Sequence, residues 1–279
     1  MRPAVPQPFF LDCRGTARFC LYHPAHGAAR AALLYLHPFA EEMNKSRRMA
    51  ALAARRLAAD GVAVLQLDLH GCGDSEGEFA EARWDGWKQD VAAGLAWLRE
   101  RSGLEPGLWG LRLGALLALD YAHGAARAPA RLLLWQPVLK GDACMTQFLR
   151  LRVAAELFGE GRPVDGGGTE GLRARLRAGE TLEIAGYELH PALALAIDGL
   201  DAARLAPPCP VDWLELVADP SRPLPPGAAR LAAAWQEQGV RLRARPVAGP
   251  QFWTAQEIEE VPLLLEASVD LYREAADAL

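Results

Sequence analysis

The chain has 279 residues, 51% of them hydrophobic, a formal net charge of −5 and no block of Lys or Arg. The length fits one large domain with at most a small insertion, and the charge argues against a general nucleic-acid or anionic-membrane surface. The N-terminal stretch MRPAVPQPFFLDCRG lacks the apolar core of a signal peptide, and no apolar run approaches the roughly 18 residues of a membrane span. We therefore expect a cytoplasmic protein without a transmembrane segment.

Apolar runs alternate with amphipathic segments along most of the chain. Strands are predicted at residues 17–23, 31–39, 62–71, 108–109, 130–137, 209–220 and 240–247. Helices are predicted at residues 45–61, 84–103, 113–124, 226–239 and at the end of the chain. Runs such as 31–39 are apolar throughout, which is typical of strands buried on both faces. Strands that alternate with helices predict βαβ units and an α/β fold with a mainly parallel, doubly wound sheet.

Residues 144–205 interrupt this alternation with an apolar helix, a Gly-rich loop (159–171), a hairpin (181–190) and a further helix. We predict that they form an insertion, packed as a lid over the carboxyl ends of the strands, where open α/β sheets bind ligands. Residues 1–143 and 206–279 then form the core. The alternative is an excursion without a gating role. Its basic run, Arg173, Arg175 and Arg177, is expected to be a solvated helix face.

The five cysteines are odd in number and scattered, and no C-x-x-C pair occurs among Cys13, Cys20, Cys72, Cys144 and Cys209. This pattern predicts neither a disulfide framework nor a structural zinc site. His, Cys and carboxylate residues do not cluster with the spacing of a metal site either. We expect no metal and no cofactor.

A sharp strand-to-helix turn is predicted in the sequence LWGLRLGALLA, where Gly110 and Gly114 bracket Arg112. In turns of the form G-x-S-x-G, the middle residue is the nucleophilic serine of a hydrolase. Arginine cannot attack a carbonyl, because it is protonated at any working pH. The residue at the centre of this turn therefore needs another explanation.

The chain resembles the α/β-hydrolase superfamily over nearly its whole length. The resemblance rests on four features in order: the HPF turn at 37–39, the loop DLHGCGDSEG, the turn at Arg112 and a late strand that ends at Asp219. It implies that the backbone N–H groups of Phe39 and Leu113 are the oxyanion donors, and that Asp219 stands in the place of the triad acid.

Several longer segments are similar to one subfamily, the second hydrolase family associated with the exosortase A system. They include PFFLDCRGTARFCLYHP, LHPFAEEMNKSRRMAA, LDLHGCGDSEGEF, WGLRLGALLA and GPQFWTAQEIEEVP. Members of that family are encoded among exopolysaccharide and protein-sorting (PEP-CTERM) genes of Gram-negative bacteria. The resemblance implies such a gene context for this chain, while the hydrolase label of that family rests on the fold.

Two of the three triad roles are empty in this sequence. Arg112 replaces the nucleophile. The catalytic histidine of this fold follows the last strand, after Asp219, but no histidine occurs beyond His190. Pro250 and Gln251 stand near the place of the base, and neither side chain can take a proton. The usual Ser–His–Asp acyl transfer is therefore not supported.

A literal G-x-S-x-G surrounds Ser75, but no helix follows it directly. We interpret it as a structural turn in which Ser75 bonds local backbone groups. Cys72 with His70 is a further candidate, since a thiolate needs a nearby base, and the alternative is a packing role for Cys72. His37 is expected to orient its turn rather than to bind a metal.

Two roles for Arg112 stay open. At a helix N-terminus its guanidinium can recognise a carboxylate or phosphate in the former catalytic cleft, or it can form an internal ion pair with Glu41 or Glu42. Trp253, with Phe252, is expected to line the cleft mouth, whereas the other tryptophans are expected in the core.

Three classes of function follow from these residues. A hydrolase of an ester or acylated sugar would use Ser75 or Cys72 with His70 or His37. A binding or regulatory protein would hold a small anionic or acyl ligand among His37, Phe39, Glu41, Arg112, Leu113 and Trp253. The third class is an interaction protein with a closed cleft. Because function must be argued from the site, the residues favour the second class, a hydrolase fold without its usual triad.

Overall fold

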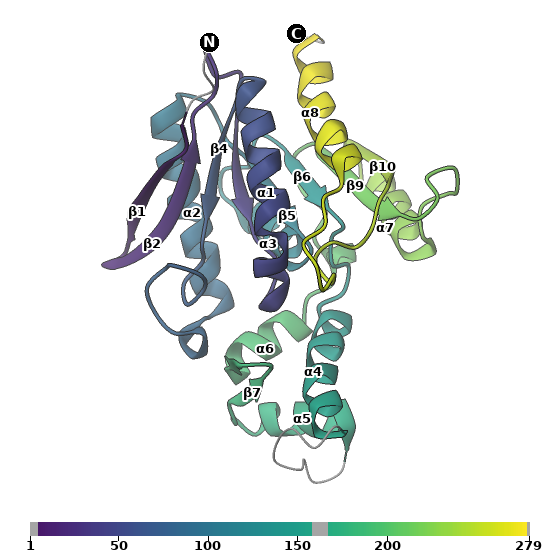
Figure 1. Ribbon diagram of the computed structural model, residues 1–279. Coiled ribbons are helices and arrows are strands. Elements are labelled where there is room, and N and C mark those ends of the chain that lie inside the picture. The colour runs from purple at the N-terminus through teal and green to yellow at the C-terminus, as the bar shows by residue number, and fades with distance from the viewer. Residues whose placement is uncertain (1–4, 158–166, 278–279) are drawn as a thin grey trace.

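The computed structural model describes residues 5–157 and 167–277, and Figure 1 shows a twisted sheet flanked by helices. The strands of this sheet are β1 (Gln7–Cys13), β2 (Thr16–His23), β3 (Ala31–Leu36), β4 (Val62–Leu67), β5 (Gly107–Leu111), β6 (Leu132–Trp135), β9 (Val211–Val217) and β10 (Leu242–Ala248). Their order is β1-β2-β4-β3-β5-β6-β9-β10. Neighbours from β4 to β10 pair in parallel, whereas β1 and β2 are antiparallel. The prediction of a mainly parallel α/β sheet is confirmed.

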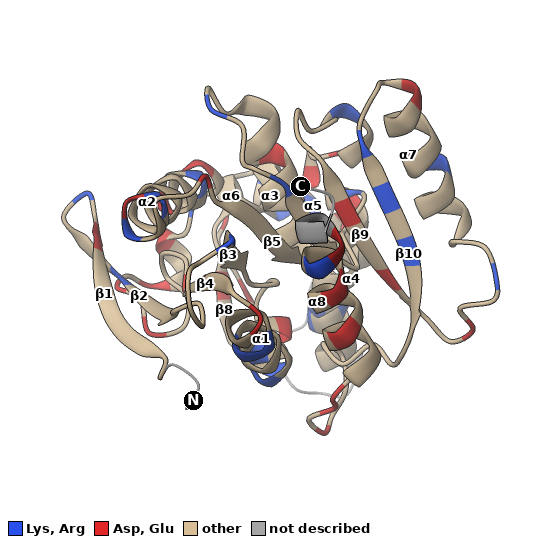
Figure 2. Cartoon of the chain, turned by 90° about the horizontal axis from the view of Figure 1, so that it is seen from above, with Lys and Arg blue, Asp and Glu red and all other residues tan. Residues whose placement is uncertain are grey.

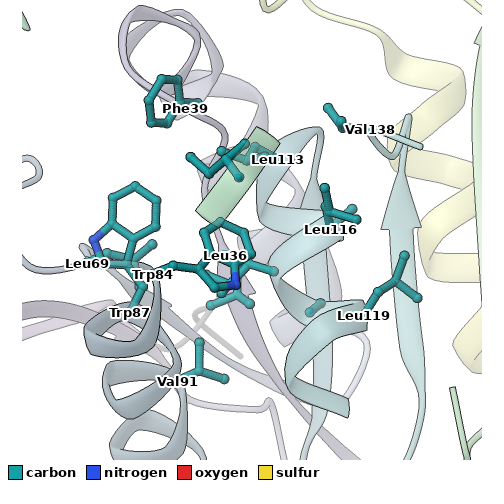
Figure 3. Packing of buried hydrophobic residues seen from close by; sticks show 14 of the residues in the cluster. Leu36, Phe39, Leu69, Trp84, Trp87, Val91, Leu113, Leu116, Leu119 and Val138 are labelled. Carbon is teal, nitrogen blue, oxygen red and sulfur yellow. The ribbon is translucent and has the colours of Figure 1, made fainter. Parts of the chain in front are cut away.

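Helices cover both faces of the sheet, as Figure 2 shows from above. One face packs against α1 (Glu41–Ala59) and α8 (Pro262–Asp277); the other packs against α2 (Trp84–Ser102), α3 (Leu113–Gly124) and α7 (Pro226–Glu237). Strands β3, β5 and β6 are almost completely buried because they have helices on both sides. Figure 3 shows part of the core between the sheet, α2 and α3, where Leu36, Trp87, Leu113 and Leu116 pack together.

Two features at the N-terminal half differ from the sequence prediction. Strand β1 was not expected, because it lies at the sheet edge and its residues, such as Phe10, are largely exposed rather than alternately buried. Helix α1 begins at Glu41 instead of residue 45. Its N-cap is Ala40, whose φ of 50° and apolar side chain give no capping signal. The acidic side chains of Glu41 and Glu42 in the first turn favour this start through the helix dipole.

The insertion between β6 and β9 lies at the carboxyl edge of the sheet (Figure 1). This insertion, which we call the cap, contains α4 (Gly141–Leu157), α5 (Gly168–Arg177), the hairpin of β7 (Leu182–Ile184) and β8 (Tyr187–Leu189), α6 (Pro191–Asp198) and the short 3₁₀ turn η2 (Ala202–Arg204). A second 3₁₀ turn, η1 (Phe79–Glu81), lies between β4 and α2. Helix α4 begins slightly before the expected boundary at residue 144. Most of the predicted Gly-rich loop lies outside the described residues.

Aromatic rings join this cap to the core. Phe148 of α4 packs against Phe39, with ring centroids 4.9 Å apart, and Tyr187 of β8 packs against Phe79 at 5.0 Å. Phe148 and Tyr187 also contact each other, at 6.4 Å. The cap therefore rests on the two loops that follow β3 and β4.

The basic run of α5 is not uniformly solvated, which corrects the expectation for Arg173. Its side chain is only 13% exposed and donates to Asp198 Oδ1 at 2.8 Å and to the Asp142 carbonyl at 2.8 Å. Arg173 thus ties α5 to α4 and α6, because all three helices meet at its guanidinium. Arg175 and Arg177, in contrast, form ion pairs at the surface.

No helix in the described ranges has the length and apolar character that crossing a bilayer requires.

Candidate functional site

Arg112 stands at the apex of the sharp turn between β5 and α3. Its backbone has φ 55° and ψ −116°, a conformation that is costly for any residue with a side chain, by about 1–3 kcal/mol. The Arg112 N–H donates to the Trp135 carbonyl at 3.1 Å, and its carbonyl accepts from Val138 N–H at 3.2 Å. These bonds to the β6 end hold the strained residue in place. The architecture of a nucleophile elbow is present, with a guanidinium where the hydroxyl would be.

The two glycines that bracket Arg112 are required by close backbone approach. A Cβ on Gly110 would lie 2.4 Å from the Ala115 Cα, and a Cβ on Gly114 would lie 2.2 Å from the Leu36 carbonyl oxygen. The first contact lets α3 turn back sharply on β5. The second brings the start of α3 against the end of β3, beside the 37–39 turn.

The Arg112 side chain is held loosely. Its Nη2 donates to Glu42 Oε1 at 3.4 Å and to Gln147 Oε1 at 3.3 Å, and its Cζ lies 5.3 Å from the centroid of the Trp253 ring. Both hydrogen bonds are longer than the usual 2.7–2.9 Å of charge-assisted bonds. Among the described residues the buried Nε of Arg112 has no partner. The predicted ion pair thus forms with Glu42, but it leaves part of the guanidinium's capacity unused.

A cavity of about 360 Å³, which we call the elbow cavity, opens beside Arg112. Polar groups from four parts of the chain reach it: Glu41 and Glu42 of α1, Arg112, Gln147 of α4, and Gln251 with Thr254 from the loop after β10. Its apolar wall consists of Phe39, Phe148, Leu151 and Trp253. The cavity thus combines one cation, two carboxylates and an aromatic wall under the cap.

Burial governs the ionisation of the acidic groups in the elbow cavity. Burial raises the pKa of Glu42, and the neighbouring charge of Glu41 adds to this, while the Arg112 guanidinium opposes it. Burial also raises the pKa of the Cys144 thiol to about 12, so this thiol stays protonated at neutral pH. The surroundings thus favour the ionised form of neither Cys144 nor Glu42.

The two expected oxyanion donors, the amides of Phe39 and Leu113, flank the elbow. Within the described chain neither N–H has a hydrogen-bond partner. The Leu113 amide belongs to the first turn of α3, whose N–H groups point toward negative charge. The side chain of Leu113 itself is buried in the core, so only its backbone faces this region.

Asp219 occupies the loop after β9 but is turned to solvent. Its Oδ1 accepts from the Ser221 N–H at 3.0 Å and from the Ser221 hydroxyl at 2.6 Å, and these bonds lower its pKa. Arg222 lies 3.5 Å from its other oxygen. The carboxylate therefore caps a turn, and no imidazole of the described residues is paired with it.

The loop after β10 brings Gln251 and Trp253 to the elbow cavity. Trp253 is buried and stacks on Arg112, as its predicted place at the cleft suggested. Phe252 does not line the cavity; it packs inward against Trp135, with centroids 6.4 Å apart. The described residues around the cavity include no histidine.

His37 belongs to the turn and not to the ligand cavity. Its Nδ1 lies 2.7 Å from the Pro38 carbonyl, and its Nε2 accepts from the Leu69 N–H at 3.3 Å. Since burial lowers its pKa, the ring is neutral, with the proton on Nδ1. The ring thus joins the loops after β3 and β4, and His37 is not among the described residues that line the elbow cavity.

The loop that carries the literal G-x-S-x-G is a saturated turn. Ser75 Oγ donates to the Asp68 carbonyl at 2.5 Å and accepts from the Phe19 N–H at 2.9 Å, so neither bond involves an imidazole. Burial raises the pKa of the Cys72 thiol far above neutrality. The His70 Nε2 lies 3.9 Å from Glu81 Oε2. The geometry does not favour Ser75 or Cys72 as a nucleophile.

Part of the candidate site could not be found from the sequence. Cys144, Gln147, Phe148 and Leu151 share one face of α4, at spacings of three and four residues. That spacing was available as a signal. The direction in which this face points, however, depends on how the cap packs against the core.

Comparison with known proteins supports the same architecture. Residues 27–191 match the family model described as Serine aminopeptidase, S33, and this segment contains the elbow and most of the cap. A comparison with curated proteins finds no match.

Solved structures of similar fold cover almost the whole chain. The ferulic-acid complex of Est1E from Butyrivibrio proteoclasticus has a TM-score of 0.68 and 15% identity, covering 95% of this chain and 98% of that one. A soluble variant of monoglyceride lipase from Saccharomyces cerevisiae, in complex with a substrate analogue, has a TM-score of 0.61 and 13% identity, covering 99% and 95%. At this identity the likeness establishes the fold. The chain therefore belongs to the α/β-hydrolase superfamily, within the family described as Serine aminopeptidase, S33.

Proposed function

We propose that this protein binds a small ligand with a carboxylate or similar anionic head and an apolar tail in the elbow cavity, and that it does not perform Ser–His–Asp acyl transfer. The observation that carries the proposal is the guanidinium at the elbow apex, which faces a cavity of about 360 Å³. Arginine at this place supplies a planar donor for a carboxylate. It cannot supply a nucleophile.

The surroundings of Arg112 support an anionic head group. Glu42 is its present partner, at 3.4 Å, and burial raises the pKa of Glu42. A ligand carboxylate with better geometry can therefore displace it at a small electrostatic cost. The positive end of α3 and the unpartnered amides of Phe39 and Leu113 add to the attraction for negative charge.

The rest of the cavity supports an apolar tail. Phe39, Phe148, Leu151 and Trp253 form a predominantly apolar wall. A short acyl chain or a ring buries apolar surface there at roughly 25 cal/mol per Å². A medium-chain carboxylate such as hexanoate is thus a suitable probe.

Isothermal titration calorimetry of hexanoate into the full chain tests this proposal. We expect saturable binding, no binding of the neutral 1-hexanol, and a loss of about 10-fold or more in affinity in Arg112→Gln, because a hydrogen bond to a charged group is lost. Arg204→Gln, a change at an exposed arginine outside the cavity, is the matched control and should bind like the wild type. Equal affinity of Arg112→Gln and wild type would contradict the proposal.

The non-catalytic part of the proposal needs a separate experiment. We expect no covalent labelling by a fluorophosphonate probe, measured by intact-protein mass spectrometry, and no turnover of short-chain aryl esters. Labelling or turnover that disappears in Ser75→Ala or Cys72→Ala would instead establish a hydrolase with non-standard residues.

The segments that resemble the exosortase-associated hydrolases support a gene context for this function. In that context the ligand belongs to exopolysaccharide or envelope assembly. Sequencing of the flanking DNA tests this part: exopolysaccharide and exosortase genes are expected nearby, and their absence would remove the assignment without affecting the binding proposal.

A further inference from the structure

A second cavity, of about 210 Å³, lies between α1 and the neighbouring face of the sheet. We call it the α1 cavity. None of its lining residues lines the elbow cavity. It is formed by β2, β3 and β4 on one side and by α1 on the other, so it lies on the face of the sheet opposite α2 and α3.

Small side chains on α1 create this space. Ala50 and Ala51 face β2 and β4 where a larger residue would fill the gap, while Phe19 and Leu21 of β2 form the opposite wall. Close-packed interiors contain few spaces of this size. The lining of the α1 cavity combines apolar side chains with the polar side chains of Tyr35, His37, Arg47, Gln66 and Asp68.

Tyr35 gives the α1 cavity a specific polar group. The residue is 4% exposed, and its ring packs against Trp109 with centroids 4.4 Å apart. Across the described chain its hydroxyl has no hydrogen-bond partner. Gln66 lies on the same wall. Its Oε1 accepts a hydrogen bond from His23 Nε2 at 2.8 Å, and its amide nitrogen has no partner among the described residues.

The charges at the α1 cavity cancel each other. Arg47 Nη2 donates to Asp68 Oδ2 at 2.9 Å, and the same oxygen accepts the Asp74 N–H at 3.1 Å. Burial raises the pKa of Tyr35, so its hydroxyl stays neutral. A charged ligand would therefore be desolvated without an opposite charge to compensate, whereas a neutral ligand would not.

We infer that the α1 cavity binds a neutral single-ring phenol, whose ring lies against Phe19 and Leu21 and whose hydroxyl bonds Tyr35. An apolar cavity of about 150 Å³ is large enough for benzene. The 210 Å³ here fits a ring with one or two small substituents. This site is independent of the ligand proposed for Arg112.

Titration of 4-fluorophenol into the full chain, followed by ¹⁹F NMR, tests the inference. We expect saturable binding with a Kd of about 1 mM or tighter. Tyr35→Phe keeps the ring and should weaken binding about 5-fold, through loss of one neutral hydrogen bond. Ala51→Leu should abolish binding by filling the space. The matched control Ala59→Leu, at an exposed position of the same helix, should bind like the wild type, as should Arg112→Gln.

The inference is overturned if no saturable binding occurs, which would mean that water alone fills the cavity. It is also overturned if folded Ala51→Leu binds 4-fluorophenol as tightly as the wild type does. Circular dichroism establishes that each variant is folded. Should Ala51→Leu unfold, nuclear Overhauser contacts from the ligand to the Leu21 and Met43 methyl groups of the wild type decide, and their absence rejects the site.

Discussion

Two turns at the carboxyl edge of the sheet divide the features of a serine hydrolase between them. The loop after β4 has the motif letters around Ser75, but the Ser75 hydroxyl is consumed by two bonds to the backbone. The turn after β5 has the strained backbone, the bracketing glycines and the adjacent cavity, but it carries Arg112. A nucleophile therefore needs both the strained backbone of an elbow and a free side-chain hydroxyl, and each of these turns has only one of the two features.

The largest effect on stability is expected from a substitution in the elbow itself. In Gly114→Ala the new Cβ would lie 2.2 Å from one backbone oxygen and 2.5 Å from another, and neither can move without displacing β3. We expect a loss of about 3 kcal/mol or more in the free energy of unfolding, measured by urea denaturation. Gly124→Ala, at the open end of the same helix, is the control and should change stability by less than about 1 kcal/mol. Similar losses in both variants would show that the elbow is not tightly built.

The Ser75 loop is expected to respond in stability alone. Ser75→Ala leaves the Phe19 N–H without its acceptor, so unfolding should become easier by about 2 kcal/mol. Hexanoate affinity at the elbow should stay unchanged. Ser221→Ala, at an exposed turn, serves as the comparison in the same denaturation experiment. A Ser75→Ala protein of wild-type stability would remove the structural explanation of this motif.

The elbow, unlike the Ser75 loop, should respond to pH through Glu42. Because its folded pKa is raised above the usual 4.5, the folded protein takes up a proton there as the pH falls, and the Glu42–Arg112 pair opens. Glu41 and Lys45 of the same helix and Cys144 of α4 are the other titratable groups around this pair. Hexanesulfonate, which stays ionised, should bind several-fold more tightly on the acidic side of this titration than on the basic side.

The raised pKa of Glu42 also makes the free energy of unfolding depend on pH. A carboxyl with a raised folded pKa costs stability once it ionises, so the cost is absent below about pH 4.5 and grows as the pH rises through the folded pKa. In Glu42→Gln the pH dependence of hexanesulfonate binding should disappear, as calorimetry at several pH values can measure. Unchanged pH dependence in Glu42→Gln would assign the titration to another group.

The smallest effect is expected at the cap side of the elbow. Gln147→Ala removes one long hydrogen bond, 3.3 Å, from a partly exposed arginine. Hexanoate affinity should change by less than about 3-fold, and stability by less than about 0.5 kcal/mol. A loss as large as that of Arg112→Gln would mean that α4 contributes the principal ligand contact.

The fold could be predicted where buried strands give continuous apolar runs in the sequence. The runs of β3, β4 and β6 are apolar throughout because helices cover both faces, and their parallel pairing followed from the alternation with helices. Strand β1 could not be predicted in this way, because an edge strand that is exposed to solvent needs no continuous apolar run. The start of α1 escaped because strained Ala40 replaces an ordinary capping residue.

The site was predictable only in its local parts. Arg112 and its possible partner Glu42 followed from glycine spacing and from a neighbouring turn. The contributions of Gln147 and Phe148 did not, because they depend on how the cap docks on the core. Arg173 was misjudged for the same reason, since its partner Asp198 belongs to a different helix of the cap.

A crystal structure of the protein with hexanesulfonate would show whether Arg112 binds an anion in the elbow cavity. We expect the sulfonate within about 3 Å of the Arg112 guanidinium, the hexyl chain against Phe148 and Trp253, and Glu42 displaced from its ion pair. An intact Arg112–Glu42 pair with no ligand beside it, in crystals soaked with excess hexanesulfonate, would rule out anion binding at Arg112.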